Sequence, residues 1–203
     1  MAIRRGEPWA TNGPLAAHAP VVSDDAALRA HVEQARRRGA MPGEIGLLGG
    51  DLCATLGGPG RRERLTSDEA VRAPIDVVRV EFAGETYWFV AHLVAHRRAW
   101  RGDAAVAMNA EWLGSWKLGP RAHPNDGLVD VTSGRLGWQD RLAARQRALS
   151  GTHLPHPALR IQRGARVELG FDRPTPVRLD GTLVGRAEQV LLTVEPDALV
   201  VVV

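Results

Sequence analysis

Residues 119–130 have the sequence Gly119-Pro120-Arg121-Ala122-His123-Pro124-Asn125-Asp126-Gly127-Leu128-Val129-Asp130. Proline fixes the backbone angle φ, and Asn, Asp and Gly tolerate tight turns, so this stretch predicts a rigid loop. Apolar and polar residues alternate from Leu128 onward, which indicates that the loop leads into a β-strand. A second acidic turn, at residues 178–182, follows in a strand-rich region, and we expect the two turns to meet in space.

The composition is typical of an ordinary globular protein. The chain has 203 residues, of which 44% are hydrophobic, and this is enough for a core. Its single cysteine, Cys53, excludes a disulfide within the chain or a zinc site made of several thiolates, and fits a reducing cytoplasm. No run approaches the roughly 18 apolar residues of a membrane-spanning helix, so we expect a cytoplasmic protein.

Arginine supplies almost all of the positive charge, because Lys117 is the only lysine. The arginines cluster in residues 36–38, 61–64, 97–101 and 141–147. Guanidinium groups match phosphate oxygens, so such clusters allow a peripheral contact with an anionic membrane. The formal net charge is only +3, and the aromatic residues, 5% of the chain, do not alternate with the arginines, which argues against a nucleic-acid partner.

The first part of the chain has the pattern of a small α/β unit. A strand at residues 20–22 is followed by Ser23, a good helix N-cap, and by a helix that ends near Arg38. A second strand at 44–48 leads to a short helix at 51–56, which ends at glycines. We place the boundary of this part near residue 66.

The rest of the chain is rich in predicted strands. A hairpin is expected from strands at 75–82 and 85–96, followed by strands at 104–113 and 128–131 and one amphipathic helix at 136–149. Six short strands are then expected at residues 158–162, 165–171, 175–179, 182–186, 188–195 and 198–203. The predicted fold class is α+β: a truncated α/β part (1–66) and a larger antiparallel β-sandwich (67–203). The apolar tail is expected to close a sheet or to join a dimer interface.

Five motifs occur in an order that resembles one family. They are Asn109-Ala-Glu-Trp-Leu-Gly114, residues 120–130, Gly151-Thr-His153, Leu179-Asp180-Gly181 and the segment from Val194 to Leu199. Together they resemble the bacterial diacylglycerol kinase or YegS-type lipid kinases, which are related to the NAD kinases. The resemblance covers residues 70–203 well and implies a lipid kinase-like β domain, a nucleotide-side domain and Mg²⁺ as a cofactor.

On the nucleotide side the sequence departs from the pattern of the family. Where the family has Gly-Gly-Asp-Gly-Thr, this chain has Ser23, Asp24, Asp25, Ala26 and Ala27. Glycine lets the backbone approach a phosphate closely, whereas carboxylates repel it, so ATP binding is doubtful. A second signature of the family is similar to residues 48–57, which contain Asp51. The resemblance therefore places Ser23, Asp24, Asp25 and Asp51 at the nucleotide site.

The catalytic base of the family is also replaced. The family has Glu after its Asp-Gly turn, and here that position is Thr182, whose hydroxyl cannot accept a proton near neutral pH. Asp180 is the alternative base. In the loop, Asp126 and the main chain at Leu128 are candidate Mg²⁺ ligands, the alternative being a turn whose side chains bond their own backbone. Asn109 and His153 would lie near the cleft.

A zinc site is not predicted from the histidines. His92 and His96 share a strand face, but no carboxylate of matching period lies near them in the sequence.

Three functions remain open on this reasoning. The preferred one is a lipid kinase-like protein without kinase activity that acts as a ligand-binding or regulatory module. Its expected ligand is a lipid or small molecule, and we expect it to form a homodimer. The first alternative is an active ATP-dependent kinase of a lipid or small alcohol that uses Asp180. The second is a structural or interaction protein without a small-molecule site.

Overall fold

The computed structural model describes residues 9–58, 60–152 and 154–203. In this part of the chain all eleven strands join one sheet, and the α+β fold class is confirmed. The main path of the sheet runs through β1 (Thr11–Asn12), β4 (Val71–Phe82), β11 (Thr182–Val202), β10 (Arg166–Leu179), β6 (His92–Ala95), β7 (Ala104–Met108), β8 (Val129–Gly134) and β9 (Leu159–Gly164). Beside this path, β5 (Glu85–Phe89) pairs with β4, and β2 (Val21–Val22) pairs with β3 (Glu44–Leu47), which pairs with β11.

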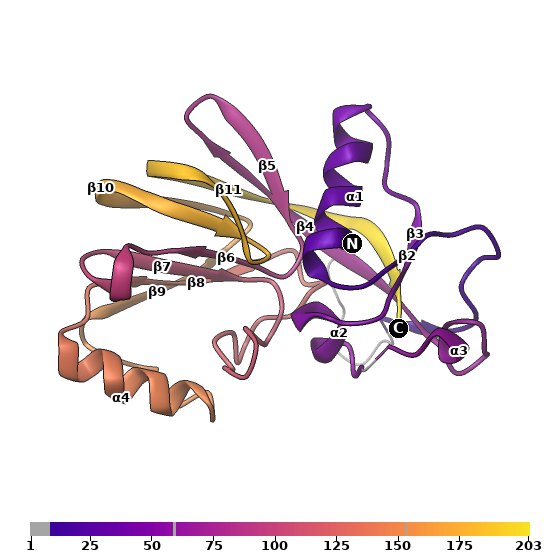
Figure 1. Cartoon of the computed structure of the whole chain (residues 1–203), viewed down its shortest axis with the longest axis horizontal. Helices are drawn as coiled ribbons and strands as arrows, with labels where there is room; N and C mark the ends of the chain where they lie inside the picture. Colours follow the sequence, from indigo (N-terminus) through magenta and orange to yellow (C-terminus); the bar gives the residue numbers. More distant parts are fainter. Residues whose placement is uncertain (1–8, 59, 153) are drawn as a thin grey trace.

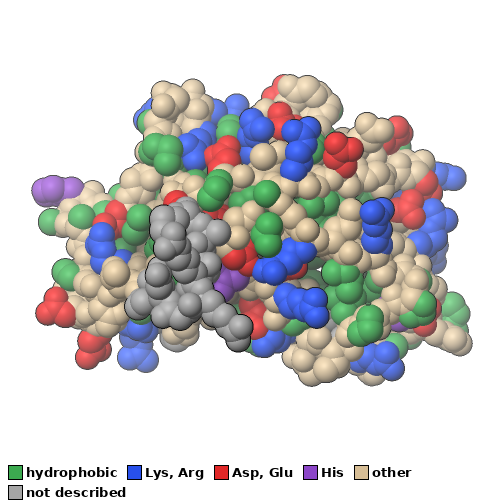
Figure 2. Space-filling view, turned by 180° about the vertical axis from the view of Figure 1, so that it is seen from behind, with side chains coloured by type: hydrophobic (Ala, Val, Ile, Leu, Met, Phe, Trp, Pro, Cys, Tyr) green, Lys and Arg blue, Asp and Glu red, His purple; other side chains and the backbone are tan. Residues whose placement is uncertain are grey.

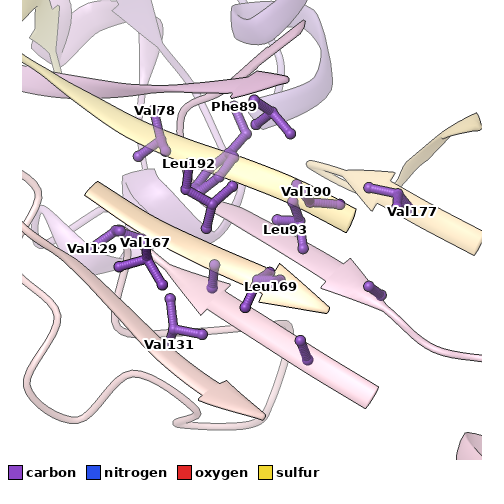
Figure 3. Close-up of a cluster of buried hydrophobic side chains, with 14 of the residues drawn as sticks. Val78, Phe89, Leu93, Val129, Val131, Val167, Leu169, Val177, Val190 and Leu192 are labelled. Atoms are coloured by element: carbon purple, nitrogen blue, oxygen red, sulfur yellow. The ribbon is translucent and has the colours of Figure 1, made fainter. Parts of the chain in front are cut away.

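The sheet folds back on itself at the junction of β10 and β6. β10 pairs with β11 along most of its length, but it pairs with β6 only through Val177–Leu179. The strands therefore form two layers, with β4, β11 and β10 in one and β6 to β9 in the other (Figure 1). Figure 3 shows Val78 and Leu192 approaching from one layer and Val129 and Val131 from the other, and all four are buried.

The last part of the chain forms three strands, so the prediction of six short strands was wrong. β9, β10 and β11 are long and continuous, and their irregularities lie within them. In β10 the register shifts between Gly170 and Thr175, and in β11 it shifts between Glu195 and Leu199. Strand ends were expected near residues 171–175 and 195–198, but at these places the structure has bulges or irregularities within a strand. Such features bend a strand without ending it.

The predicted hairpin is interrupted, because residues 85–96 are not one strand. β5 ends at Phe89 and β6 begins at His92. The N–H groups of Val90 and Ala91 donate to the Asp180 carboxylate, at 3.0 and 2.9 Å. They are therefore not available to a strand ladder, and the chain changes from one layer to the other at this point.

The N-terminal part has the predicted strand and helix order. α1 (Asp25–Arg37) follows β2, and α2 (Asp51–Thr55) follows β3. The N-cap is Asp24 and not Ser23, because the Asp24 carboxylate accepts the N–H of Ala27 at 2.9 Å. Ser23 contributes indirectly, since its hydroxyl donates to Asp24. β3 pairs in parallel with the end of β11, so this part shares its sheet with the β-rich part; the domain boundary stays a prediction.

The end of β11 closes the sheet, which was one of the two expectations for the apolar tail. Val201 pairs with Ile45 on one side and with Ala73 on the other, and it is fully buried. Residues of α1, α2, β3 and β4 complete this second core (Figure 1).

The remaining helices are α3 (Arg62–Leu65), the 3₁₀ turn η1 (Arg98–Trp100) and α4 (Trp138–Ala148). α4 lies along the outside of β8 and β9 (Figure 1). No helix in the described ranges has the length and apolar character needed to cross a bilayer. Positive and negative side chains are interspersed over the face in Figure 2. Ion pairs of this kind join Arg135 to Asp103 and to Asp172.

Candidate functional site

Two parallel strands each lead into a helix that begins with aspartate. β2 and β3 are parallel neighbours, and they are followed by Asp25 at the start of α1 and Asp51 at the start of α2. The carboxyl ends of parallel strands lie at one edge of a sheet, which is where ligands bind in open α/β sheets. The two carboxylates consequently come together although they are far apart in the sequence.

Hydrogen bonds fix both carboxylates. Asp25 accepts the backbone N–H of Asp51 at 2.6 Å and that of Leu52 at 3.2 Å. Asp51 accepts the N–H of Gly114 through Oδ1 at 2.8 Å, and its Oδ2 lies 2.9 Å from Nε2 of His92. This group, Asp25, Asp51 and His92, is called the acidic–histidine cluster below.

Asp180 supports the cluster from the turn between β10 and β11. Asp180 and Gly181 both have positive φ, 46° and 81°, as a tight hairpin turn requires. The Asp180 carboxylate accepts the N–H groups of residues 90–92, including that of His92 at 3.0 Å. It thus holds the start of β6 and the histidine that this strand carries.

Burial and neighbouring charges shift the pKa values of the carboxyl groups and the imidazole at this site. Burial, together with the charge of Asp180, raises the pKa of Asp25 to about 7. Burial also raises the pKa of Asp180 above its ordinary value. Burial alone would lower the pKa of His92, but the hydrogen bond with Asp51 and the nearby carboxylates raise it overall. The cluster therefore favours bound positive charge, whether protons or a cation.

A second group of polar side chains holds the loop at residues 119–130. Asp76, in the middle of β4, is almost fully buried. Its carboxylate accepts the N–H of Gly127 at 2.6 Å and that of Asp197 at 3.0 Å, and its own N–H donates to Pro124 at 2.7 Å. Asn125 donates to the Asp197 side chain at 2.8 Å, so the loop is anchored to the bulge of β11.

An apolar cavity of about 500 Å³ lies between α4 and the outer face of the sheet. Its lining includes Val106 of β7, Trp100 of η1, and Trp116 and Leu118 from the segment between β7 and β8. α4 contributes residues that include Leu142 and Ala144. Arg141 and Arg145 of α4 also line the cavity. Arg141 donates to the carbonyl of Ala99 at 2.8 Å, and the Arg145 guanidinium lies 5.6 Å from the centre of the Trp116 ring.

Comparison with known families decides the family of the chain. The family described as "YegS C-terminal NAD kinase beta sandwich-like domain" matches residues 74–203. The chain belongs to this family. The matched range contains the whole two-layered sheet from β5 to β11 together with most of β4.

Solved structures agree with this YegS-type fold. A diacylglycerol kinase from Bacillus anthracis str. Sterne has 13% sequence identity and a TM-score of 0.66, covering 89% of this chain and 74% of that one. A protein from the same organism that is proposed to be a diacylglycerol kinase has 12% identity and a TM-score of 0.67, covering 89% and 76%. At these identities the similarity concerns the fold. No curated protein matches the chain in sequence.

The YegS-type fold brings together three of the predicted site residues, Asp25, Asp51 and Asp180. It adds His92, which sequence reasoning passed over because its carboxylate partner comes from α2 and not from its own strand. Ser23 and Asp24 lie exposed before α1, where they cap the helix. A local signal for Asp76 exists, since it is a charged residue within the apolar alternation of β4.

The other predicted residues have different surroundings. Asn109 is fully buried, and its amide donates to the carbonyls of Asp76 and Val90 at 2.9 and 2.8 Å. It thereby joins the loop at 119–130 to the segment that Asp180 holds. Thr182 is exposed at the start of β11. His153 lies outside the described residues.

The loop residues proposed as Mg²⁺ ligands are engaged with protein groups. Asp126 accepts the N–H of Leu128 at 3.0 Å, and its other oxygen pairs with Arg163. Arg163 also contacts Asp130 at 3.4 Å. The bond from Leu128 is of the kind that the alternative describes, a turn that bonds its own backbone, whereas the contacts of Arg163 come from β9. The metal at Asp126 stays a prediction.

Proposed function

We propose that this YegS-type chain binds a lipid in the cavity under α4 and does not transfer phosphate to it. The apolar cavity of about 500 Å³ is the observation that supports this most directly. Ligand pockets of proteins typically have volumes of about 300–1,000 Å³ and mostly apolar linings. Since related folds are described as diacylglycerol kinases, a glycerolipid is the ligand class that we propose.

The cavity has the two kinds of surface that an amphipathic lipid needs. Its tryptophan, leucine and valine side chains suit acyl chains, since burying apolar area stabilises the complex by about 25 cal/mol per Å². The guanidinium groups of Arg141 and Arg145 suit the oxygen atoms of a head group.

α4 also has features of a membrane-facing helix. Its Trp138 and Leu142 are 65% and 58% exposed, although both side chains are strongly apolar. Arg141, Arg145 and Arg147 lie on the same short helix. Exposed apolar side chains next to arginines favour the surface of an anionic bilayer, and the predicted peripheral membrane contact is assigned here to α4.

The residues at the nucleotide site support the absence of phosphoryl transfer. At the start of α1, the N–H of Ala27 donates to the Asp24 carboxylate, so an anion already occupies the position where a phosphate would bind. The N–H groups of Asp51 and Leu52 donate to Asp25 in the same way. A nucleotide triphosphate would meet carboxylates at both helices, and Mg²⁺ alone would have to compensate for them.

The two candidate catalytic bases, Thr182 and Asp180, also support the absence of phosphoryl transfer. Thr182 has no basic group, and Asp180 is 5% exposed with its two oxygens accepting three backbone N–H groups. A carboxylate held in this way stabilises the backbone and has little access to a substrate hydroxyl.

Lipid binding is tested by titrating the protein with dioctanoylglycerol and following tryptophan fluorescence, because Trp100, Trp116 and Trp138 line the cavity. Ala144→Phe should fill the cavity and weaken binding at least tenfold. Gln146→Phe is the matched control, since Gln146 is an exposed residue of the same helix, and it should leave binding unchanged. Equal affinity of wild type and Ala144→Phe would contradict the cavity as the binding site.

The alternatives are separated by two further results. With radiolabelled ATP, Mg²⁺ and diacylglycerol we expect no labelled lipid, and transfer that Asp180→Asn abolishes would favour the active kinase. Absence of any lipid binding by calorimetry would favour a structural or interaction protein.

A further inference from the structure

We propose that Asp25, Asp51 and His92 bind one divalent first-row transition-metal ion, with Zn²⁺ as the best match. This inference goes beyond lipid binding, because the acidic–histidine cluster and the cavity under α4 share no residue.

The distances in the cluster are close to those of a metal site. One ligand atom from each of the three residues lies within 4.8 Å of the others, and the Asp51 Oδ2 to His92 Nε2 distance is 2.9 Å. Zinc bonds to nitrogen and oxygen are about 2.0–2.2 Å long, so tetrahedral ligand atoms lie about 3.3 Å apart. An ion could therefore replace the proton between Asp51 and His92 with a small movement, and Asp25 would supply the third ligand.

The charge of the cluster requires compensation. Asp25, Asp51 and Asp180 place three carboxyl groups around one imidazole, and among the described residues no arginine or lysine forms an ion pair with any of them. Their partners are backbone N–H groups and the His92 ring, so a protonated His92 is the only full positive charge that pairs with them among the described residues, and a bound cation would supply more. A divalent ion would neutralise the cluster without a change in the backbone.

The types of donor atom select the metal. Mg²⁺ prefers six oxygen ligands, whereas an imidazole nitrogen with carboxylates suits Zn²⁺ and its neighbours. His92 is 4% exposed, and its Nδ1 has no hydrogen-bond partner among the described residues. The only polar contact of its ring is thus with Asp51, and the ring is directed into the cluster.

The ligands are already held in place. Asp25 is oriented by two backbone N–H groups, Asp51 by the N–H of Gly114, and the His92 backbone by Asp180. Such outer contacts orient first-layer ligands in known metal sites and strengthen metal binding. Three fixed ligands leave further positions of the ion to water, as in an open zinc site.

The test is metal titration of the chelator-treated full chain by calorimetry, with Zn²⁺ and Mg²⁺ as separate titrants and Co²⁺ as an absorbance probe. We expect one Zn²⁺ per chain, a raised melting temperature and visible Co²⁺ bands without thiolate charge transfer. His92→Gln and Asp51→Asn should each weaken Zn²⁺ binding at least tenfold. His96→Gln is the matched control, because His96 follows β6 directly but contacts Trp100 and the carbonyl of Arg97.

Several results would overturn the proposal. The proposal fails if the wild type shows no saturable Zn²⁺ binding, if His92→Gln still binds Zn²⁺ as wild type does, or if His96→Gln loses Zn²⁺ binding. A Mg²⁺ affinity equal to that for Zn²⁺ would also contradict the choice of metal. Circular dichroism of each variant checks folding. Because His92 is not among the residues that line the cavity, His92→Gln should bind dioctanoylglycerol as wild type does, so failure of one proposal leaves the other intact.

Discussion

Removing the Asp76 carboxylate should destabilise the protein strongly, because this side chain anchors the loop at residues 119–130. In Asp76→Ala the N–H groups of Gly127 and Asp197 lose their acceptor. A fully buried donor without a partner costs about 1–3 kcal/mol, and because these two donors are only partly buried we expect the free energy of unfolding to fall by about 2–4 kcal/mol. That is a large part of the roughly 5–15 kcal/mol that stabilises a typical domain. Asp76→Asn keeps one acceptor oxygen and should lose about half as much.

The pH dependence gives a second signature of the same residue. Burial raises the pKa of Asp76 above its ordinary value of 3.8. The folded state therefore holds the proton more tightly than the unfolded state does. Part of the stability is present below about pH 4 and is lost as the pH rises through the folded pKa. Asp76→Ala lacks this part of the pH dependence, so its deficit relative to wild type should shrink slightly from acidic to neutral pH.

Urea denaturation of the chelator-treated protein, followed by tryptophan fluorescence at several pH values, measures both effects. Asp68→Ala is the control, since Asp68 is exposed, and its unfolding free energy should change by less than about 0.5 kcal/mol. Unchanged stability of Asp76→Ala would refute the argument that the carboxylate anchors the loop. A midpoint that falls equally in Asp76→Ala and Asp68→Ala would refute it as well.

Three further substitutions test other parts of the structure. Gly50→Ala should lower the free energy of unfolding by about 2 kcal/mol or more and weaken Zn²⁺ binding in calorimetry, because Gly50 has φ 96° and an added Cβ would overlap the Asp25 carboxylate. Gly170→Ala is the control and should be nearly neutral, because the space around Gly170 is open. Replacing Trp138 and Leu142 together by Glu should weaken sedimentation with anionic vesicles at least tenfold while the melting temperature stays within a few degrees, because both side chains are exposed. Arg163→Ala should cost at most about 1 kcal/mol in urea denaturation, because its pairs with Asp126 and Asp130 are partly exposed.

Local signals were enough to predict the elements that carry Asp25 and Asp51. Short apolar strands followed by an acidic helix start are encoded within a few residues, so Asp25 and Asp51 could be placed before any tertiary contact was known. The choice between neighbouring caps was beyond this reasoning. Both Ser23 and Asp24 are good caps, and the difference lies in which backbone angle the chain adopts after β2.

Contacts between distant segments explain what the sequence could not predict. His92 acquires its role from Asp51, and the break between β5 and β6 depends on Asp180, which lies in the turn between β10 and β11. The segments around Gly170 and Glu195 look like turns locally, yet pairing with neighbouring strands keeps them in β10 and β11. Periodicity describes one strand at a time and carries no information about such partners.

The acidic–histidine cluster lies at a position of the fold where few side-chain changes are needed to favour a cation over a phosphate. The carboxyl ends of β2 and β3 are a place where an open α/β sheet receives a ligand, and helix starts there offer N–H groups to an anion. In this chain those N–H groups donate to Asp24 and Asp25, so their positive character is already used by the protein. The side chains that remain in this buried cluster are two carboxylates and an imidazole, which suit a divalent cation better than a phosphate. The same backbone geometry can therefore support opposite ligand charges, and side chains at a few positions decide between them.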